Sequence, residues 1–365
     1  MRIAYLCSST SWGGLELNHL KNAQWMQQRG HAVWVFAPAE APLFERAKAL
    51  DLKVIPFHKQ PKYVAWRTAL NLVKQLRACQ ITHVFIRDNR DMSLLASIKF
   101  LSGKRITTCY FMEMQLGVSK RGLLHTLRYT WVDGWFCPLH GLVDQVRSLT
   151  RINLEKIHYL PSGIDFSGIK KIPKSEARLA LDLPTEGFVF GLIGRFDRQK
   201  GQLLALEALH QLHQPSFSIV FLGEPTKNEQ EDISGLIQQK IDDFALHDRV
   251  YLRPFMQEVS GFYSAIDALI MATKAETFGM VTLEALSYEL PVVGSNAGGT
   301  PELLGFGKFG ELFESLNSQD LARAMTQRVS SPREMDASSL REHLKKFDHH
   351  RVCKALEDYL HKDHG

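Results

Sequence analysis

Two cations lie five residues apart in a short loop, Gly194 to Gly201, whose sequence is GRFDRQKG. The loop follows an apolar run at 188–193 and precedes a helical pattern at 202–212, so Arg195 and Lys200 flank a helix N-terminus. A helix N-terminus and two cations attract an anion, and a guanidinium fits phosphate oxygens. We expect a diphosphate to bind here; the alternative is a solvated basic turn.

A second polar segment places two carboxylates eight residues apart, at Glu276 and Glu284. Glu276 follows a predicted strand at 268–271, and Glu284 lies on a helix that begins near Thr282. An ionised carboxylate only accepts hydrogen bonds, which suits the vicinal hydroxyls of a sugar or a ribose. The amides of residues 279–281, at the helix start, can meet an anion. Each carboxylate alone could also be an exposed acid at a helix end.

A third loop, residues 8–14, follows the first apolar strand and ends in the pair Gly13-Gly14. Glycines before a helix let a phosphate or a substrate approach the backbone, although a tight strand-to-helix turn is an equal alternative. The loop is not the G-x-G-x-x-G of NAD sites, and the chain has no G-x-x-x-x-G-K-[ST] phosphate loop. Without an Asp-x-Asp motif or a zinc-like His/Cys spacing, we expect no metal.

The elements that must position these loops alternate between short apolar strands and helical segments, which is typical of parallel sheets covered by helices. All three loops leave a strand and enter a helix, where open α/β sheets bind ligands. A length of 365 residues predicts about two such domains, with a hinge between 161 and 184. Strands are predicted at 3–7, 32–36, 53–57, 83–86, 106–111 and 134–137, and again at 188–193, 218–222, 250–252, 268–271 and 291–294.

The composition favours a cytoplasmic globular protein. Hydrophobic residues make up 45% and charged residues 23% of the chain, as in ordinary soluble folds. No apolar run approaches the roughly 20 residues that span a bilayer, and the N-terminus does not resemble a signal peptide. The five cysteines are scattered without a C-x-x-C pair, which indicates reduced thiols.

The formal net charge of +5 conceals a difference between the two halves. Residues 1–160 hold 22 Lys and Arg against 10 Asp and Glu, a net charge of +12, and the rest hold 22 against 29, a net charge of −7. A basic half attracts an anionic acceptor or the anionic cytoplasmic leaflet of a membrane. Segments 59–77 and 120–131 interleave Lys and Arg with aromatic and leucine side chains, which suits an interfacial helix. The alternative is a solvated basic face over a buried aromatic stripe. Nucleic acid is not expected, because no recognised binding module accompanies the charge.

In their order along the chain, these segments resemble the retaining glycosyltransferases of family 4 (glycosyl transferases group 1). The resemblance rests on Gly13-Gly14, the Arg195/Lys200 loop, the E-x7-E of Glu276 and Glu284, and the run GGTPE at 298–302. The run PSGID at 161–165 also resembles the family's interdomain segment, with Ser where Asn is common. The resemblance implies an α/β protein of GT-B fold, with two Rossmann-like domains facing across a cleft. These would be an acceptor-side domain at 1–165, a nucleotide-sugar-binding domain at 166–345, and a C-terminal helix at 346–365 that can pack back on the first domain.

The resemblance also implies a role for each matched residue. Arg195 and Lys200 would hold the donor diphosphate and stabilise the departing negative charge. Glu276 would accept hydrogen bonds from the donor sugar, and Glu284 from the ribose. The expected catalytic residues are Arg195, Lys200 and Glu276, and the expected donor-binding residues are Gly13, Gly14, Gly194, Arg253, Phe278, Gly279, Met280, Val281 and Glu284.

One position departs from the family pattern. After the strand at 106–111 many members carry a His, whereas this sequence has Met112-Glu113-Met114-Gln115. Glu113 could contact the donor sugar or the acceptor, or could be an ordinary loop acid, so the role of the His is not carried over. Asp88 and Arg90 follow another strand end and are assigned, with Glu113, to the acceptor side.

The resemblance thus implies metal-independent, retaining transfer of a hexosyl group from a nucleotide-diphosphate sugar, with UDP favoured over GDP and ADP. The acceptor would be a glycan or a lipid-linked sugar in cell-surface polysaccharide or lipopolysaccharide synthesis. No cofactor is expected, and the basic domain would be able to contact the inner face of the cell membrane. Two alternatives stay open, a non-catalytic sugar-nucleotide or glycan-binding protein and a sugar-nucleotide epimerase on the same fold. The epimerase would need an acid–base set that these loops do not supply.

Overall fold

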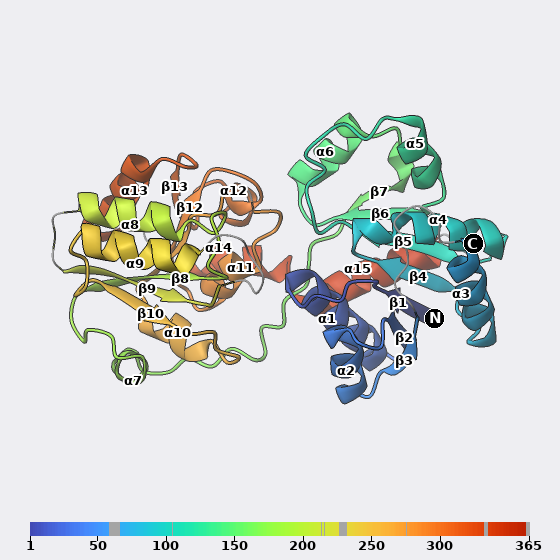
Figure 1. Cartoon of the computed structure of the whole chain (residues 1–365), viewed down its shortest axis with the longest axis horizontal. Helices are drawn as coiled ribbons and strands as arrows, with labels where there is room; N and C mark the ends of the chain where they lie inside the picture. The colour runs from blue at the N-terminus through green and yellow to red at the C-terminus, as the bar shows by residue number, and fades with distance from the viewer. Residues whose placement is uncertain are drawn as a thin grey trace. The chain divides into compact units, whose positions relative to one another are not determined.

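The computed structural model describes residues 1–57, 66–103, 105–212, 214, 216–225, 232–274, 276–331 and 335–362. The chain divides into two compact units, one comprising 1–163 and 347–365 and the other 164–346 (Figure 1). Each unit is built on a sheet whose strand pairs are all parallel. The expectation of two Rossmann-like domains is confirmed.

The first unit contains a seven-stranded sheet in the order β3-β2-β1-β4-β5-β6-β7. Its strands are β1 (Arg2–Leu6), β2 (Ala32–Ala37), β3 (Lys53–Pro56), β4 (His83–Ile86), β5 (Thr107–Phe111), β6 (Gly134–Cys137) and β7 (Ile157–Tyr159). Its helices are α1 (Gly14–Gln28), α2 (Pro42–Ala49), α3 (Trp66–Ala78), α4 (Met92–Ser102), α5 (Leu123–Thr130), α6 (His140–Leu149) and α15 (His349–Lys362), with short 3₁₀ turns at Asn89–Asp91 and Leu154–Lys156.

The central strands of this sheet are buried on both faces, as a parallel sheet covered by helices requires. On one face, side chains of β1 and β2 form a core with α1, α2 and α15. The C-terminal helix α15 contributes Val352, Leu356 and Leu360 to this core. At its surface Glu357 forms an ion pair at 2.6 Å with Arg29, the residue directly after α1.

The second unit contains a six-stranded sheet in the order β10-β9-β8-β11-β12-β13. Its strands are β8 (Phe188–Ile193), β9 (Phe217–Leu222), β10 (Val250–Arg253), β11 (Ala268–Met271), β12 (Val292–Ser295) and β13 (Gly310–Phe313). Its helices are α7 (Lys174–Ala180), α8 (Gln202–Gln211), α9 (Ile233–Asp243), α10 (Ser260–Ala265), α11 (Met280–Ser287), α12 (Thr300–Leu303), α13 (Ser318–Ser330) and α14 (Ala337–Lys345). One core lies between the sheet and α8, α9 and α13, and a second lies between the sheet and α7, α10 and α11.

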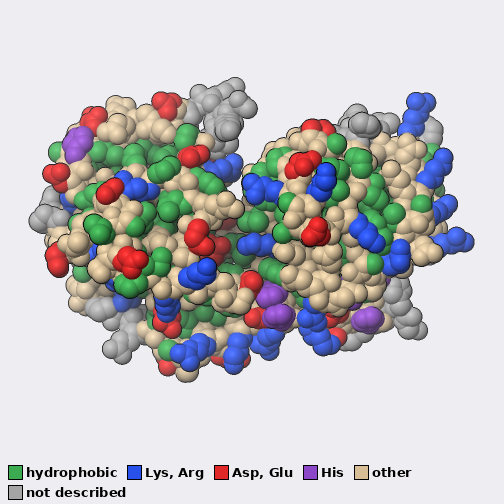
Figure 2. Space-filling model, turned by 90° about the horizontal axis from the view of Figure 1, so that it is seen from below, with side chains coloured by type: hydrophobic (Ala, Val, Ile, Leu, Met, Phe, Trp, Pro, Cys, Tyr) green, Lys and Arg blue, Asp and Glu red, His purple; other side chains and the backbone are tan. Residues whose placement is uncertain are grey.

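The charge difference follows the division into units. Residues 1–163 carry a net charge of +12 and the tail 347–365 holds three basic and four acidic residues, so the first unit carries +11. Figure 2 shows Lys and Arg side chains gathered along the right-hand edge of the view, over the first unit. Among the described residues, no helix combines the length and the apolarity that crossing a bilayer requires.

Candidate active site

The strand orders of the two sheets determine where the predicted site residues lie. In the first sheet the order of the strands reverses between β1 and β4, and in the second it reverses between β8 and β11. Open parallel sheets bind ligands at such reversal points, outside the carboxyl ends of the strands. The loops singled out in the sequence follow β1, β8 and β11, and therefore lie at these two points.

In the second unit, Lys200 and Glu276 meet across the reversal point. Lys200 Nζ donates a hydrogen bond to Glu276 Oε2 at 2.9 Å, and each side chain is roughly one-quarter exposed or less. The loop that carries Lys200 begins at Gly194 and is fixed by Asp197, whose Oδ1 accepts the backbone N–H of Lys200 at 3.0 Å. Gln202 Nε2 donates to the carbonyl oxygen of the loop residue 195 at 2.8 Å. The lysine is therefore held in place by its own loop.

Two glycines allow the backbones around this pair to approach closely. Gly201 has φ +82°, and a Cβ there would lie 2.4 Å from the carbonyl oxygen of Ala272, just after β11. Gly298 has φ +63°, and its Cβ would lie 2.1 Å from the carbonyl oxygen of Glu276. Gly299 N–H also donates to that oxygen at 2.8 Å. The GGTPE run thus packs against the backbone of Glu276 and positions its carboxylate.

Arg195 differs from Lys200 in its surroundings. Its side chain is 65% exposed, and its only ion pair among the described residues, to Asp197, is long at 3.8 Å. A loosely held guanidinium at a loop that faces solvent can turn toward a phosphate. The two predicted cations thus lie on one loop, one of them fixed and one of them adaptable.

Glu284, on α11, is oriented by a buried tyrosine that the sequence did not single out. Tyr263 of α10 is 1% exposed and its hydroxyl donates to Glu284 Oε2 at 2.8 Å. Its ring stacks on Tyr288 at a centroid distance of 5.1 Å. Burial, and then the adjacent carboxylate, raise the pKa of Tyr263 well above its usual value, so the phenol remains a proton donor.

The start of α11 supplies backbone groups to this site. Gly279 precedes the helix with φ +92°, and Met280 and Val281 occupy its first turn, where helix N–H groups have no partner within the helix. Phe278 is only 4% exposed and its side chain belongs to the interior, so any contact with a donor would come from its backbone.

Arg253 is not brought to this group by any contact of the described residues. Its guanidinium donates to the carbonyl oxygens of Leu181 at 2.7 Å, Leu252 at 2.8 Å and Asp182 at 3.0 Å. It lies at the end of β10, an edge strand, two positions away from β8. These bonds make Arg253 a brace between β10 and the segment that leads into β8.

In the first unit, the Gly13-Gly14 turn leads into α1. A Cβ at Gly14 would meet nothing within 4 Å, so the backbone is open to approach. At Gly13, however, the carboxylate of Glu16 lies 3.5 Å from the corresponding Cβ position, and Glu16 is buried. A carboxylate in the first turn already complements the helix dipole and opposes a second anion beside Gly13.

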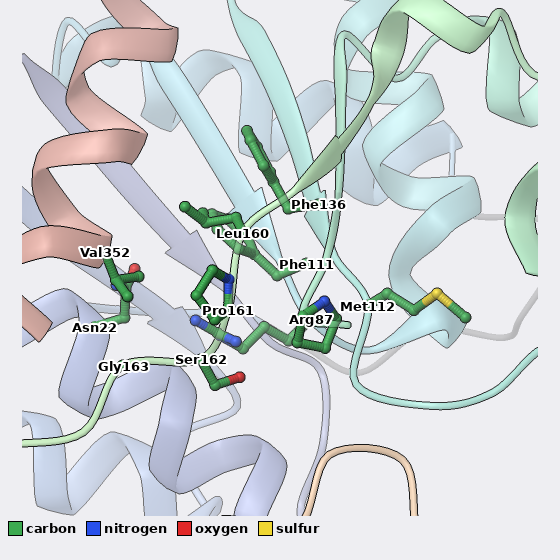
Figure 3. Close-up of a pocket in the computed structure, with 11 residues that line it drawn as sticks. Asn22, Arg87, Phe111, Met112, Phe136, Leu160, Pro161, Ser162, Gly163 and Val352 are labelled. Atoms are coloured by element: carbon green, nitrogen blue, oxygen red, sulfur yellow. The ribbon is translucent and has the colours of Figure 1, made fainter. Parts of the chain in front are cut away.

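Glu113, in the segment after β5 where the family resemblance led us to expect a His, forms a buried ion pair with Arg87, which directly follows β4. The Glu113 and Arg87 side chains are 9% and 7% exposed, and Asn18 Nδ2 donates to Glu113 Oε2 at 3.4 Å. Burial raises the pKa of Glu113, whereas the charge and hydrogen bond of Arg87 oppose the rise. Figure 3 shows the Arg87 side chain lying alongside Pro161 and Ser162, where it lines a small cavity of about 10 Å³.

Asp88 and Arg90 pair with each other beside this site. The Asp88 carboxylate accepts the backbone N–H of Arg90 at 2.8 Å and its Nε at 2.7 Å. The next acid, Asp91, is buried and accepts the backbone N–H of Ser8, in the loop after β1, at 3.0 Å. Burial raises the pKa of Asp91 to about 7.

Sequence reasoning did not identify Arg87, Asn18, Asp91 or Tyr263 as site residues. Arg87 and Asp91 flank the Asp88–Arg90 pair, so their place directly after a predicted strand was an available signal. Asn18 and Tyr263 lie on helices, and no pattern in the sequence distinguishes them. Among the described residues, no group of three or more His, Cys, Asp or Glu side chains is arranged to hold a metal ion.

Known proteins resemble this chain in both sequence and fold. It is 27% identical over 202 residues to D-inositol 3-phosphate glycosyltransferase 1 of Catenulispora acidiphila, a match covering 53% of this chain and 48% of the relative. It is 26% identical over 240 residues to the O-antigen biosynthesis glycosyltransferase WclY of Escherichia coli, a match covering 63% of this chain and 65% of the relative. The chain thus spans about half to two-thirds of the length of these relatives.

Among solved structures, Anabaena HepE in complex with UDP superposes with a TM-score of 0.86 at 21% identity, covering 99% of this chain and 100% of that one. A glycosyltransferase from Rickettsia africae superposes with a TM-score of 0.85 at 16% identity, covering 98% and 97%. At these identities the likeness establishes the fold, which is GT-B.

Two family models match the chain in succession. "Glycosyltransferase Family 4" matches residues 12–167 and "Glycosyl transferases group 1" matches residues 173–347. The chain therefore belongs to the family 4, group 1 glycosyltransferases of GT-B fold.

Proposed function

We propose that this protein is a retaining, metal-independent glycosyltransferase that moves a hexosyl group from a nucleotide-diphosphate sugar, with UDP favoured, to a glycan or lipid-linked acceptor. The observation that carries the proposal is the contact of Lys200 with Glu276 at the reversal point of the second sheet. A cation for the diphosphate and an acceptor-only group for sugar hydroxyls are thereby held within one hydrogen bond of each other.

The chemical step needs charge stabilisation more than a protein nucleophile. The bond between the anomeric carbon and the β-phosphate oxygen breaks, and an acceptor hydroxyl forms the new bond on the same face of the sugar. The departing diphosphate gains negative charge, which Lys200 and Arg195 stabilise, and a phosphate oxygen takes the hydroxyl proton. The two cations supply charge that a metal ion would otherwise bring, which is the basis for proposing metal independence.

The charges around the first sheet favour a neutral acceptor group. Four carboxylates gather at the ends of β1, β4 and β5, on Glu16, Asp88, Asp91 and Glu113, and the neighbouring cations Arg87 and Arg90 are each engaged with one of them. A site of this balance has no surplus positive charge for an anion, and its carboxylates suit hydroxyl groups. The net positive charge of the first unit therefore comes from Lys and Arg side chains outside this site.

The names of similar proteins support the substrate classes. HepE forms complexes with UDP and with UDP-glucose, which favours UDP as the donor nucleotide here. WclY is named for O-antigen biosynthesis, which favours a glycan acceptor in a cell-surface polymer.

Calorimetric titration of the full chain with UDP, GDP and ADP, each with a chelator and then with Mg²⁺, tests the donor site. At a UDP concentration about 100 times the Kd, the fold should gain about 2.7 kcal/mol, which a thermal shift also detects. Selective binding of UDP that is unaffected by chelator would support the proposal. Tight binding without turnover of any UDP-sugar would instead identify a non-catalytic binding protein.

A further inference from the structure

The basic first unit has two segments whose composition suits either an interfacial helix or a solvated basic face, and the two segments differ in how far their apolar side chains are exposed. Of the segment 59–77, residues 59–65 lie outside the described part of the chain. The remainder forms α3, which buries Ala69, Leu72 and Leu76 against the unit, as an ordinary amphipathic helix does. In the described part of α3, the apolar stripe is already covered.

Helix α5 shows the opposite arrangement. Leu123, Leu124 and Leu127 are 82%, 73% and 60% exposed. They lie at positions i, i+1 and i+4 and therefore share one face of the helix. Val118, in the loop before the helix, is also exposed. Large apolar side chains gathered in this way on a surface usually mark an interaction site.

The helix is firmly docked, so its leucines are not exposed through loose packing. On the inner side of α5 Tyr129 is buried, and Arg128 Nη1 donates to Ser93 Oγ of α4 at 3.1 Å. The preceding loop is held by Lys120 N–H, which donates to the carbonyl oxygen of Leu149, the last residue of α6, at 2.7 Å. Figure 1 shows α5 beside α6 at one end of the first unit.

The charges around the leucines have a single sign. Residues 114–131 contain Lys120, Arg121 and Arg128 and no Asp or Glu. An apolar ridge with basic residues beside it complements a surface that is apolar within and anionic at its boundary. A second copy of the chain is a poor partner, because a two-fold contact would bring these cations against their own copies.

We propose that the α5 surface, comprising Val118, Lys120, Arg121, Leu123, Leu124 and Leu127, docks the protein on an anionic phospholipid bilayer. The leucines enter the boundary between headgroups and acyl chains, and the basic side chains contact lipid phosphates. The surface begins a few residues after Glu113, so a docked bilayer lies near the carboxyl ends of β4 and β5. This inference goes beyond the proposed function, because docking needs neither donor nor turnover.

Vesicle cosedimentation of the full chain tests the proposal. Vesicles of phosphatidylcholine with about one-third phosphatidylglycerol should bind the protein at about 0.1 M salt, and phosphatidylcholine alone should bind it much less. The triple substitution Leu123→Glu, Leu124→Glu and Leu127→Glu should lower the partition coefficient at least about tenfold. The pair Lys120→Ala and Arg121→Ala should lower it several-fold, mainly at low salt.

Leu179 provides a matched control, because it is a helical leucine in the second unit with 74% exposure, close to that of Leu124. The substitution Leu179→Glu should leave vesicle binding unchanged. Circular dichroism and UDP calorimetry confirm that each variant is folded, independently of lipid. The proposal is overturned if the wild-type chain does not bind anionic vesicles, or if the triple variant binds them as well as Leu179→Glu does. It is also overturned if the triple substitution only abolishes self-association.

Discussion

The ion pair between Lys200 and Glu276 leads to a prediction in which substitutions of the two residues change the affinity for UDP differently. UDP carries the diphosphate and the ribose but not the hexosyl group, so it should engage Lys200 and not the proposed role of Glu276 in binding the donor sugar. In the unliganded site Lys200 Nζ is hydrogen-bonded to the Glu276 carboxylate at 2.9 Å, so Glu276 competes with the diphosphate of UDP for the lysine. Removing the lysine should therefore weaken UDP binding, whereas neutralising the glutamate should not.

The expected sizes follow from the contacts. Lys200→Met keeps most of the aliphatic stem but removes a charge-assisted hydrogen bond to phosphate, worth about 1.5–3 kcal/mol, so the Kd for UDP should rise about 10- to 100-fold. The Glu276 carboxylate would also lose its cation and would repel the diphosphate. Glu276→Gln removes that negative charge and frees Lys200, so the Kd for UDP should stay the same or fall by up to about tenfold.

Turnover should respond differently from UDP binding. Both variants should lower kcat/KM for the UDP-sugar, by on the order of 100-fold or more, because each lacks a contact that the transition state needs. Isothermal titration with UDP and an assay of UDP release from the UDP-sugar would measure the two quantities separately. Glu276→Gln would then combine undiminished UDP affinity with impaired turnover.

A matched control is available in the same unit. Lys171 and Glu289 form an ion pair at 2.7 Å, with both side chains about half exposed. Glu289→Gln should change neither UDP affinity nor turnover. If Glu276→Gln weakened UDP binding as strongly as Lys200→Met does, Glu276 would act by holding the lysine in place rather than by binding the donor sugar. Unchanged UDP affinity in Lys200→Met would move the diphosphate away from this loop.

Three further substitutions test positioning and charge. Tyr263→Phe removes the donor that orients Glu284, and should raise the Kd for UDP about three- to tenfold but leave that of 2′,3′-dideoxy-UDP unchanged in calorimetry. Because burial raises the pKa of Asp91 to about 7, its ionisation lowers the free energy of unfolding as pH rises from 3.8 toward 7. Asp91→Asn should thus become progressively more stable than wild type over that range in urea unfolding, and a pH-independent difference would contradict this. The hydrogen bond from Arg29, more than any other contact, lowers the pKa of Glu357 to about 2, so its contribution to stability is present above 4.5 and is lost as pH falls toward 2. Glu357→Gln should destabilise the chain by about 1–2 kcal/mol at neutral pH, and the difference should vanish in acid unfolding experiments.

The fold could be predicted largely because its central strands are buried on both faces and read as continuous apolar runs. The two strands absent from the prediction, β7 and β13, are short and lie at sheet edges. β7 has only three residues, and its burial is partial. β13 carries Glu311, which is buried in an ion pair with Arg328 and interrupts the apolar run.

The loops of the site could be predicted, but the side-chain pairings within them could not. Lys200 and Glu276 are 76 residues apart, and Arg87 and Glu113 are 26 apart. Each pair meets because the strands before its members are neighbours in the sheet. Sequence spacing alone does not say which strands are neighbours. The glutamate at 113 therefore remained ambiguous between a loop acid and a site residue until its partner was located.

Each unit pairs a cation with the carboxylate that is proposed to bind hydroxyl groups. A carboxylate accepts hydrogen bonds from sugar hydroxyls at all of its lone pairs only while it is ionised. Burial favours the protonated form, and at Glu113 it does raise the pKa. Arg87, which follows β4, opposes that rise. In the second unit, Lys200 is the cation that pairs with Glu276. A substitution that removes Arg87 would therefore change the pKa of Glu113 as well as one contact. Lys200→Met leaves the Glu276 carboxylate without its cation, whereas Glu276→Gln leaves Lys200 without its carboxylate. The two variants are therefore expected to change UDP affinity in opposite directions rather than by different amounts alone.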